Sequence, residues 1–115
     1  MTNVIFHPPR HPADKAYREG IVKQLQLLLK DRVDQAYIFG SFTTEGFHGD
    51  SDLDLILICR TEEPFVERGR SFFDLFDLGI AIDLLVYTPE EWEQIKREKP
   101  VGFWKSAFAT LRQIL

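Results

Sequence analysis

One segment constrains the fold more than any other, because it begins as an alternating acidic stretch and ends as an unbroken apolar run. Residues 52–59 read DLDLILIC. Strict alternation is typical of a strand with one face in water, whereas an apolar run requires cover on both faces. The sequence therefore predicts a strand whose far end is covered on both faces, in a fold of the α/β (α+β) class.

The neighbouring segments predict further helices and strands. Residues 13–30 repeat apolar side chains at intervals of three and four, which is the pattern of an amphipathic helix. Residues 36–39 and 80–87 are rich in β-branched and aromatic side chains and predict two more strands. Residues 64–76 predict a second helix, with four phenylalanines among charged residues and Gly79 after its end.

Two helices are predicted toward the end of the sequence. Thr88, Pro89 and Glu91 supply an N-cap, a proline in the first turn and a capping-box glutamate, so a helix begins at Pro89. Residues 102–115 predict a last helix. The side chains that this helix is expected to bury are Phe103, Ala107, Phe108, Leu111 and Ile114 or Leu115.

Length and composition predict one domain. The 115 residues, 44% hydrophobic and 28% charged, match an ordinary globular protein with a single core. We expect this domain to span residues 1–115, with residues 1–12 as an extended arm because three prolines fall within them. His7 and His11 in that arm are four apart, but the prolines between them exclude the helix that would let them share a metal.

Charge and apolar content limit the partners and the location. A formal net charge of −4 works against non-specific binding to nucleic acids or anionic lipids. The longest uninterrupted apolar run, residues 55–59, is too short for a membrane span, which needs roughly 18 residues. The single cysteine, Cys59, cannot form an intrachain disulfide. We expect a cytoplasmic protein with no membrane anchor.

Three carboxylates are candidates for chemistry. Alternation places Asp52 and Asp54 on one face of their strand, with Cα atoms about 6.8 Å apart. Such a pair repels itself unless a cation such as Mg²⁺ lies between the two groups. Asp83 interrupts the apolar run IAIDLLVY, and an adjacent strand would bring it to the same point. The alternatives are a solvated strand face for the pair and a charge that protects an edge strand for Asp83.

Gly40 and Ser41 follow the predicted strand at residues 36–39. A residue without Cβ lets backbone amides approach a phosphate closely, and the serine hydroxyl can donate to it, although Gly-Ser also forms plain turns. Ten residues, 42–51, separate this pair from Asp52 and Asp54, which gives the pattern GSx10DxD. The interval makes the pair more informative than a turn alone.

With these motifs in order, the sequence resembles the nucleotidyltransferases of the DNA polymerase β superfamily, and in particular the minimal nucleotidyltransferases (MNT proteins). The resemblance runs from Tyr37 to the end, through IFGSF, SDLDLIL and IDLLVYTPEEW, and KPVGFWKSAFATL is similar to the closing helix of those domains. It implies a nucleotidyltransferase fold, in which a small mixed β-sheet is flanked by helices.

The resemblance also implies residue roles and a reaction. Gly40 and Ser41 match the positions that hold the β- and γ-phosphates of ATP. Asp52 and Asp54 match two metal ligands, and Asp83 matches the third carboxylate, which would hold the second metal and help to deprotonate the acceptor. The implied reaction is Mg²⁺-dependent transfer of AMP from ATP to an acceptor hydroxyl.

One loop departs from the family pattern. Many members have a basic residue shortly after Gly-Ser, whereas this sequence has Thr43, Thr44 and Glu45. The positive charge that faces the triphosphate would then have to come from elsewhere in the chain. The candidates are Arg60, Arg68, Arg70 and Lys105.

The resemblance suggests a biological role. Small proteins of this type resemble antitoxins that adenylylate a helical HEPN-type toxin, and the catalytic domain leaves little room for further domains, so we expect such a partner. Two alternatives remain: a catalytically silent nucleotidyltransferase-like antitoxin that acts by binding, and a stand-alone enzyme that nucleotidylates a small molecule. Trp92 and Trp104 fall on apolar helical faces and are expected in the core or at an interface, not as base-stacking platforms.

Overall fold

The computed structural model describes residues 15–44 and 52–115, so the arm expected over residues 1–12 lies outside it. The elements are α1 (Lys15–Leu29), β1 (Gln35–Phe39), the 3₁₀ helix η1 (Gly40–Thr43), β2 (Leu53–Ile58), the 3₁₀ helix η2 (Phe65–Leu78), β3 (Ile82–Tyr87), α2 (Pro89–Arg97), α3 (Gly102–Thr110) and β4 (Arg112–Gln113). Among the residues described, no helix has both the length and the apolar character needed to cross a membrane.

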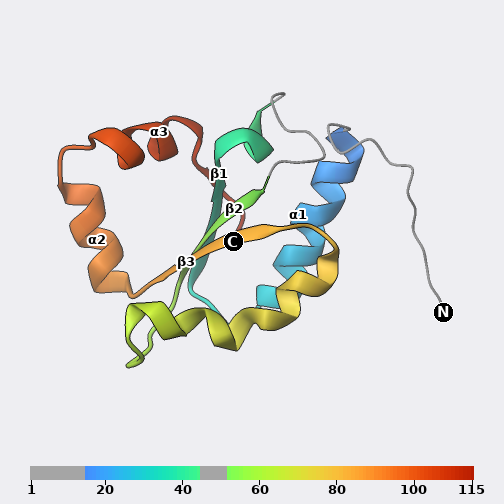
Figure 1. The fold of residues 1–115 in the computed structure, drawn as a ribbon, viewed down its shortest axis with the longest axis horizontal. Coiled ribbons are helices and arrows are strands. Elements are labelled where there is room, and N and C mark those ends of the chain that lie inside the picture. The colour runs from blue at the N-terminus through green and yellow to red at the C-terminus, as the bar shows by residue number, and fades with distance from the viewer. Residues whose placement is uncertain (1–14, 45–51) are drawn as a thin grey trace.

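The strands form one mixed sheet in the order β3-β2-β1-β4 (Figure 1). β1 pairs antiparallel with β2 and with β4, whereas β2 pairs parallel with β3. Because parallel neighbours need a crossover connection, η2 leaves the end of β2 and returns the chain to the start of β3. The small mixed sheet flanked by helices confirms the predicted fold class.

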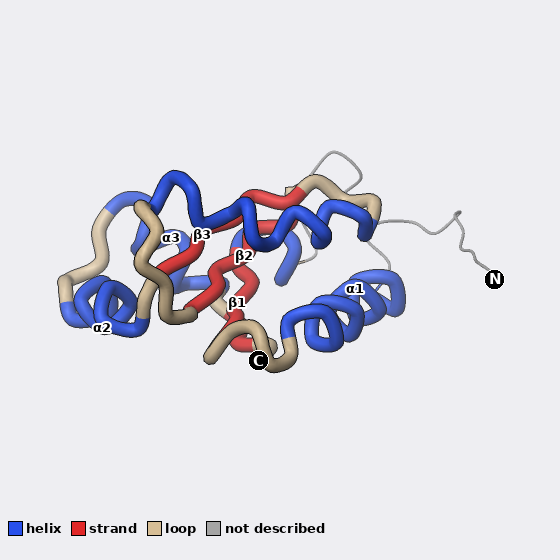
Figure 2. Tube along the Cα trace, turned by 90° about the horizontal axis from the view of Figure 1, so that it is seen from below, coloured by secondary structure: helices blue, strands red, loops and turns tan. Residues whose placement is uncertain are grey.

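Each face of the sheet has its own core. Ile38, Leu55 and Leu57 face α1 and η2, while Tyr37 and Ile56 face α2 and α3. Figure 2 shows α1 and α2 on opposite sides of the strands. Residues 55–58 of β2 are therefore buried without interruption, as the apolar run in the sequence predicts.

The segment predicted as a helix at residues 64–76 is 3₁₀ and is interrupted at Phe72, whose φ is −124° and ψ is 20°. A 3₁₀ helix repeats every three residues. Phe72 and Leu75 therefore share the buried side, and Phe73 and Phe76 share the other side, where they are exposed.

The prediction for residues 102–115 is wrong in two respects. α3 ends at Thr110, and the chain then runs as β4 along the edge of β1. The physical reason is that the end of the chain pairs with β1, which lies far away in the sequence. The Ile114 N–H donates to the Ala36 carbonyl (2.8 Å), and the Ala36 N–H donates to the Leu115 carbonyl (3.1 Å). Phe103, expected in the core, is 55% exposed.

A buried arginine ties η2 to β3 and α2. Arg68 is 8% exposed, donates to the Val86 carbonyl (3.1 Å) and forms two hydrogen bonds with the Glu91 carboxylate (2.6 and 3.2 Å). Glu91 also closes the predicted capping box by accepting from the Thr88 N–H (2.9 Å). One carboxylate thus starts α2 and neutralises a buried guanidinium, which lowers the pKa of Glu91.

We expect Glu91→Gln to reduce the free energy of unfolding by about 1–2 kcal/mol, since it weakens charged hydrogen bonds at a half-exposed side chain. The matched control is Glu90→Gln, which breaks an ion pair with Arg60 between two exposed side chains and should change little. Urea unfolding of both variants measures the difference. Equal losses would contradict the structural role given to Arg68.

Candidate active site

The chain turns sharply where β1 ends, and Gly40 makes this turn possible. Its φ is 76°, in the left-handed region that favours glycine. A Cβ at this position would also overlap Oδ2 of Asp54, so the backbone comes very close to that carboxylate. Gly40 is therefore required for its conformation and for the space that it leaves to Asp54.

Two carboxylates lie side by side next to this turn. Asp54 of β2 is the register partner of Asp83 of β3, and on the other side it is the register partner of Phe39. Partners in register project from the same face of a sheet, here the face that α2 and α3 cover. The prediction that an adjacent strand brings Asp83 to the first carboxylates is supported for Asp54.

The environment of Asp54 disfavours its charge. Burial, together with the negative charges of Asp83 and Asp52, raises the pKa of Asp54 to about 6. Asp54 is half-buried, whereas Asp52 and Asp83 are exposed. A cation bound between these oxygens would relieve the repulsion, and carboxylate oxygens are the ligands that Mg²⁺ prefers. The donor set therefore fits a hard divalent cation.

The three carboxylates do not form a closed cluster. Asp54 and Asp83 are direct neighbours, while Asp52 precedes β2. Within residues 15–44 and 52–115, no three acidic, histidine or cysteine side chains are gathered tightly enough to hold a metal by themselves. Additional ligands, such as phosphate oxygens, would be needed to complete a coordination sphere.

The turn after Gly40 is held closed by its own threonines. Thr43 Oγ1 donates to the Gly40 carbonyl (2.9 Å), and the Thr44 N–H donates to the Ser41 carbonyl (3.0 Å). The Ser41 hydroxyl makes no hydrogen bond with any residue in the described ranges, and Ser41 is half-buried. This hydroxyl is therefore available to a ligand beside the carboxylates.

The arginines suggested as substitutes for a basic loop residue form other contacts. Arg60 pairs with Glu90 and Arg70 with Glu67. Arg68 is bound near the opposite end of β3 from Asp83, as described above. Lys105 is exposed on α3.

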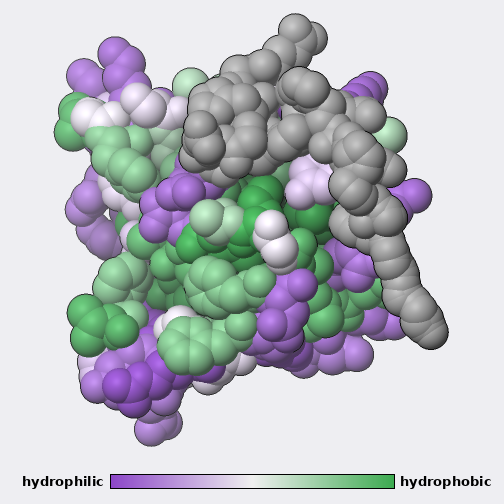
Figure 3. Space-filling view, turned by 45° about the vertical axis from the view of Figure 1, so that its right-hand side comes forward, coloured by the Kyte–Doolittle hydropathy of each residue, from purple (hydrophilic) through white to green (hydrophobic). Residues whose placement is uncertain are grey.

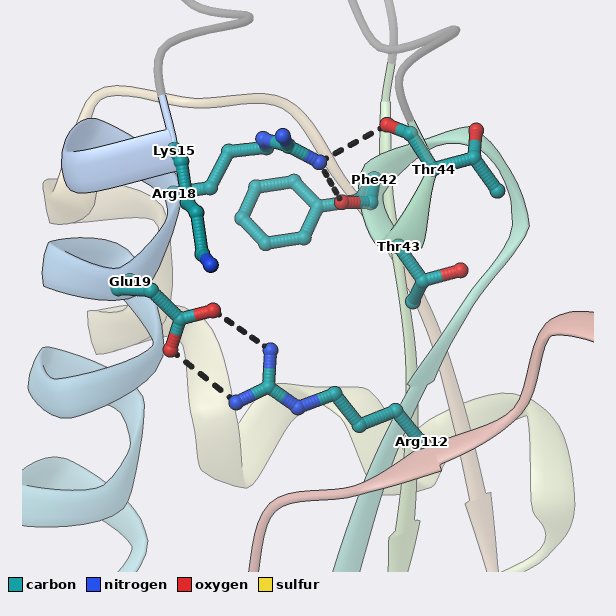
Figure 4. A pocket seen from close by; sticks show the side chains of 7 residues that line it. All are labelled: Lys15, Arg18, Glu19, Phe42, Thr43, Thr44 and Arg112. Carbon is teal, nitrogen blue, oxygen red and sulfur yellow. Dashed lines mark hydrogen bonds and ion pairs between the residues drawn. The ribbon is translucent and has the colours of Figure 1, made fainter.

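Positive charge reaches the loop from α1 instead. Arg18 donates from Nη1 to the carbonyls of Phe42 (3.2 Å) and Thr44 (2.8 Å). Figure 4 shows Arg18 and Lys15 beside η1, and an Arg112–Glu19 ion pair below them, around a cavity of about 330 Å³. The candidate carboxylates do not line this cavity. Glu45, the third residue of the loop that departs from the family pattern, lies outside the described residues.

Thr110 is a second residue that the sequence did not indicate. It ends α3, and its Oγ1 accepts from the Gly40 N–H (2.7 Å). Arg18 lies 24 and 26 residues from its two partners and Thr110 lies 70 residues from Gly40, and neither belongs to the motifs that carry the Gly-Ser pair or the carboxylates. Only folding brings them to the turn.

Carboxylates that fit a divalent cation, next to a turn whose serine hydroxyl is available to a ligand, suit metal-assisted chemistry on a phosphorylated substrate. Comparison with protein families agrees: residues 23–98, more than half of the chain, match the family "Polymerase beta, Nucleotidyltransferase". The chain therefore belongs to the polymerase beta nucleotidyltransferase family. No curated protein matches it in sequence.

Gly40→Ala tests the turn against a matched glycine. Gly79 has a similar φ of 79°, but a Cβ added there would meet no atom within 4 Å, so Gly79→Ala should cost about 1 kcal/mol of backbone strain. Gly40→Ala adds the overlap with Asp54, and we expect a loss of about 3 kcal/mol in the free energy of unfolding. Chemical denaturation compares them. Equal costs would show that the close approach to Asp54 is unimportant.

The raised pKa of Asp54 predicts a pH-dependent penalty on the fold. Its folded value of about 6 lies above the ordinary value of 3.8, so the penalty is absent below about pH 4 and complete above about pH 6. We expect metal-free Asp54→Asn to be more stable than the parent at pH 7.5, by on the order of 1 kcal/mol after allowing for solvent screening. Thermal melts at pH 7.5 and pH 4 measure this.

The control for that measurement is Asp77→Asn, which removes an exposed carboxylate on η2 and should change the stability little at either pH. A gain in Asp54→Asn that is the same at pH 4 and pH 7.5 would argue against the charge explanation.

Proposed function

We propose that this protein transfers AMP from ATP to a hydroxyl of a partner protein, and that it does so as the antitoxin of a helical HEPN-type toxin. The observation that carries the transferase activity is the register of Asp54 and Asp83 beside the Gly40 turn. The family match supports the reaction class. The identity of the partner rests on the resemblance of the motifs to minimal nucleotidyltransferases.

The triphosphate would bind across the turn and the carboxylates. The Ser41 hydroxyl and amides of η1 other than that of Gly40 would donate to the β- and γ-phosphates, while Asp52, Asp54 and Asp83 would hold Mg²⁺. When bound, Mg²⁺ neutralises phosphate charge and stabilises the attacking and leaving oxygens. Phosphate oxygens would then complete a coordination sphere that the three carboxylates leave open.

The transfer step exchanges one phosphorus–oxygen bond for another. The acceptor oxygen forms a bond with the α-phosphorus, the bond from that phosphorus to the β-phosphate bridge breaks, and pyrophosphate leaves. The acceptor proton passes to Asp83, which is exposed on the outer strand of the sheet and open to an incoming hydroxyl. Gly40 and Ser41 would steady the departing pyrophosphate.

Exposure of the carboxylates supports a macromolecular acceptor. Asp52 and Asp83 are exposed, so a docked protein would supply the wall that excludes water as well as the hydroxyl. Figure 3 shows hydrophobic side chains gathered over β3 and η2, where Val66 and Phe73 are 87% and 63% exposed. An apolar surface of this kind suits a protein partner.

One observation favours the second candidate, a silent antitoxin that acts by binding. The Gly40 N–H is bonded to Thr110 and is therefore not free for a phosphate. The two candidates differ in whether inhibition of the partner requires Asp54 and Asp83.

The test uses the protein with its purified toxin partner, ATP and Mg²⁺. We expect the intact mass of the partner to rise by about 329 Da, one adenylyl group. Asp54→Asn and Asp83→Asn should each abolish the mass shift, since they remove metal-binding charge and not core packing. Loss of Asp54 should weaken triphosphate binding, whereas loss of Asp83 should mainly slow the transfer.

The control is Asp77→Asn, an exposed carboxylate on η2 that should leave the mass shift unchanged. Inhibition of the toxin at unchanged mass, equally by the parent and by Asp54→Asn, would establish the binding antitoxin instead. Full transfer by Asp83→Asn would show that this carboxylate has no role.

A further inference from the structure

An aromatic side chain lies unexpectedly in the open beside the candidate site. Phe103 is 55% exposed although it belongs to an apolar segment. Its ring meets Phe39 edge-on, with centroids 5.7 Å apart, and Trp104 edge-on at 4.9 Å. The neighbouring rings thus hold Phe103 by contacts that leave much of its surface to solvent.

Phe103 is held close to the Gly-Ser turn and to the carboxylates. Phe39, which it contacts, directly precedes Gly40 and is the register partner of Asp54. Cross-strand partners are about 5 Å apart, so Phe103 lies on the order of 10 Å from Asp54. Figure 1 shows α3 beside the end of β1 and next to η1.

A nucleotide bound as described above would extend over this distance. With its β- and γ-phosphates at Gly40 and Ser41 and its α-phosphate at Asp54, its base lies one ribose away. From the carboxylates, the ribose and base could lie in either of two directions along the face that α2 and α3 cover. One leads to the open edge at β3, where the acceptor approaches, and the other leads to β1 and α3, where Phe103 lies. The second direction offers an exposed aromatic ring in contact with the strand that carries the Gly-Ser turn.

We propose that Phe103 is the stacking platform for the base of the nucleoside triphosphate. This inference rests on the proposed function and extends it to a residue outside the catalytic motifs. Stacking uses the flat surface that every base has, so it adds affinity without reading hydrogen-bonding groups. The site should therefore accept ATP and GTP with similar affinity and bind pyrimidine nucleotides more weakly, because their rings are smaller.

The experiment compares ATP with inorganic tripolyphosphate, which has no base, by calorimetric titration in Mg²⁺ without acceptor. Phe103→Ala should weaken ATP binding roughly 5- to 100-fold and leave tripolyphosphate binding unchanged. Phe103→Trp should restore ATP binding. Because Trp104 touches Phe103, ATP should alter tryptophan fluorescence in the parent protein, whereas tripolyphosphate should not.

The matched control is Phe73→Ala, since Phe73 is also exposed but belongs to η2 on the other face of the sheet, and it should bind ATP like the parent. The inference would be overturned if Phe103→Ala bound ATP as tightly as the parent. It would also be overturned if Phe103→Ala raised the KM for the acceptor and left the KM for ATP unchanged. A folded parent protein that binds neither ATP nor tripolyphosphate would instead refute the proposed function, and the stacking role with it.

Discussion

The parallel register between β2 and β3 is the constraint on which the candidate site depends. It places Asp54 opposite Asp83, and it is fixed by burial and not by the carboxylates, which repel each other. A slip of one residue would turn Asp83 toward the core under η2 and expose Leu84 on the wrong face. The apolar residues of two strands therefore hold together two charges that would otherwise separate.

The Gly40 turn is likewise held in place by contacts from other elements of the fold. Its backbone is held in the left-handed region, its N–H is bound by Thr110 of α3, and Arg18 of α1 binds the carbonyls just beyond it. Helices from opposite faces of the sheet thus converge on one short segment. Because Arg18 and Thr110 bind backbone groups, and the hydroxyls of Thr43 and Thr44 donate to carbonyls within the turn, the turn keeps its shape without a basic side chain at these two positions.

The carboxylates that make the candidate site also reduce the stability of the fold. A half-buried carboxylate beside two others has a raised pKa and weakens the fold at neutral pH. The surrounding structure offsets that cost through cores on both faces of the sheet and through the Arg68–Glu91 pair, which closes the opposite end of β3. An open set of acidic groups of this kind fits a divalent cation that brings further ligands of its own.

The sequence by itself determined the local features: the alternation that leaves Asp54 partly open and buries Leu55, and the start of α2 at Pro89. These follow from the periodicity of strands and from capping, which act over a few residues. Tertiary structure decided what depends on distant partners. It ended α3 at Thr110 because β4 pairs with β1, and it brought Thr110 and Arg18 to the turn. It also left Phe103 more than half exposed, because the ring contacts Phe39 of β1 and Trp104 of α3 at the margin of the core instead of entering it.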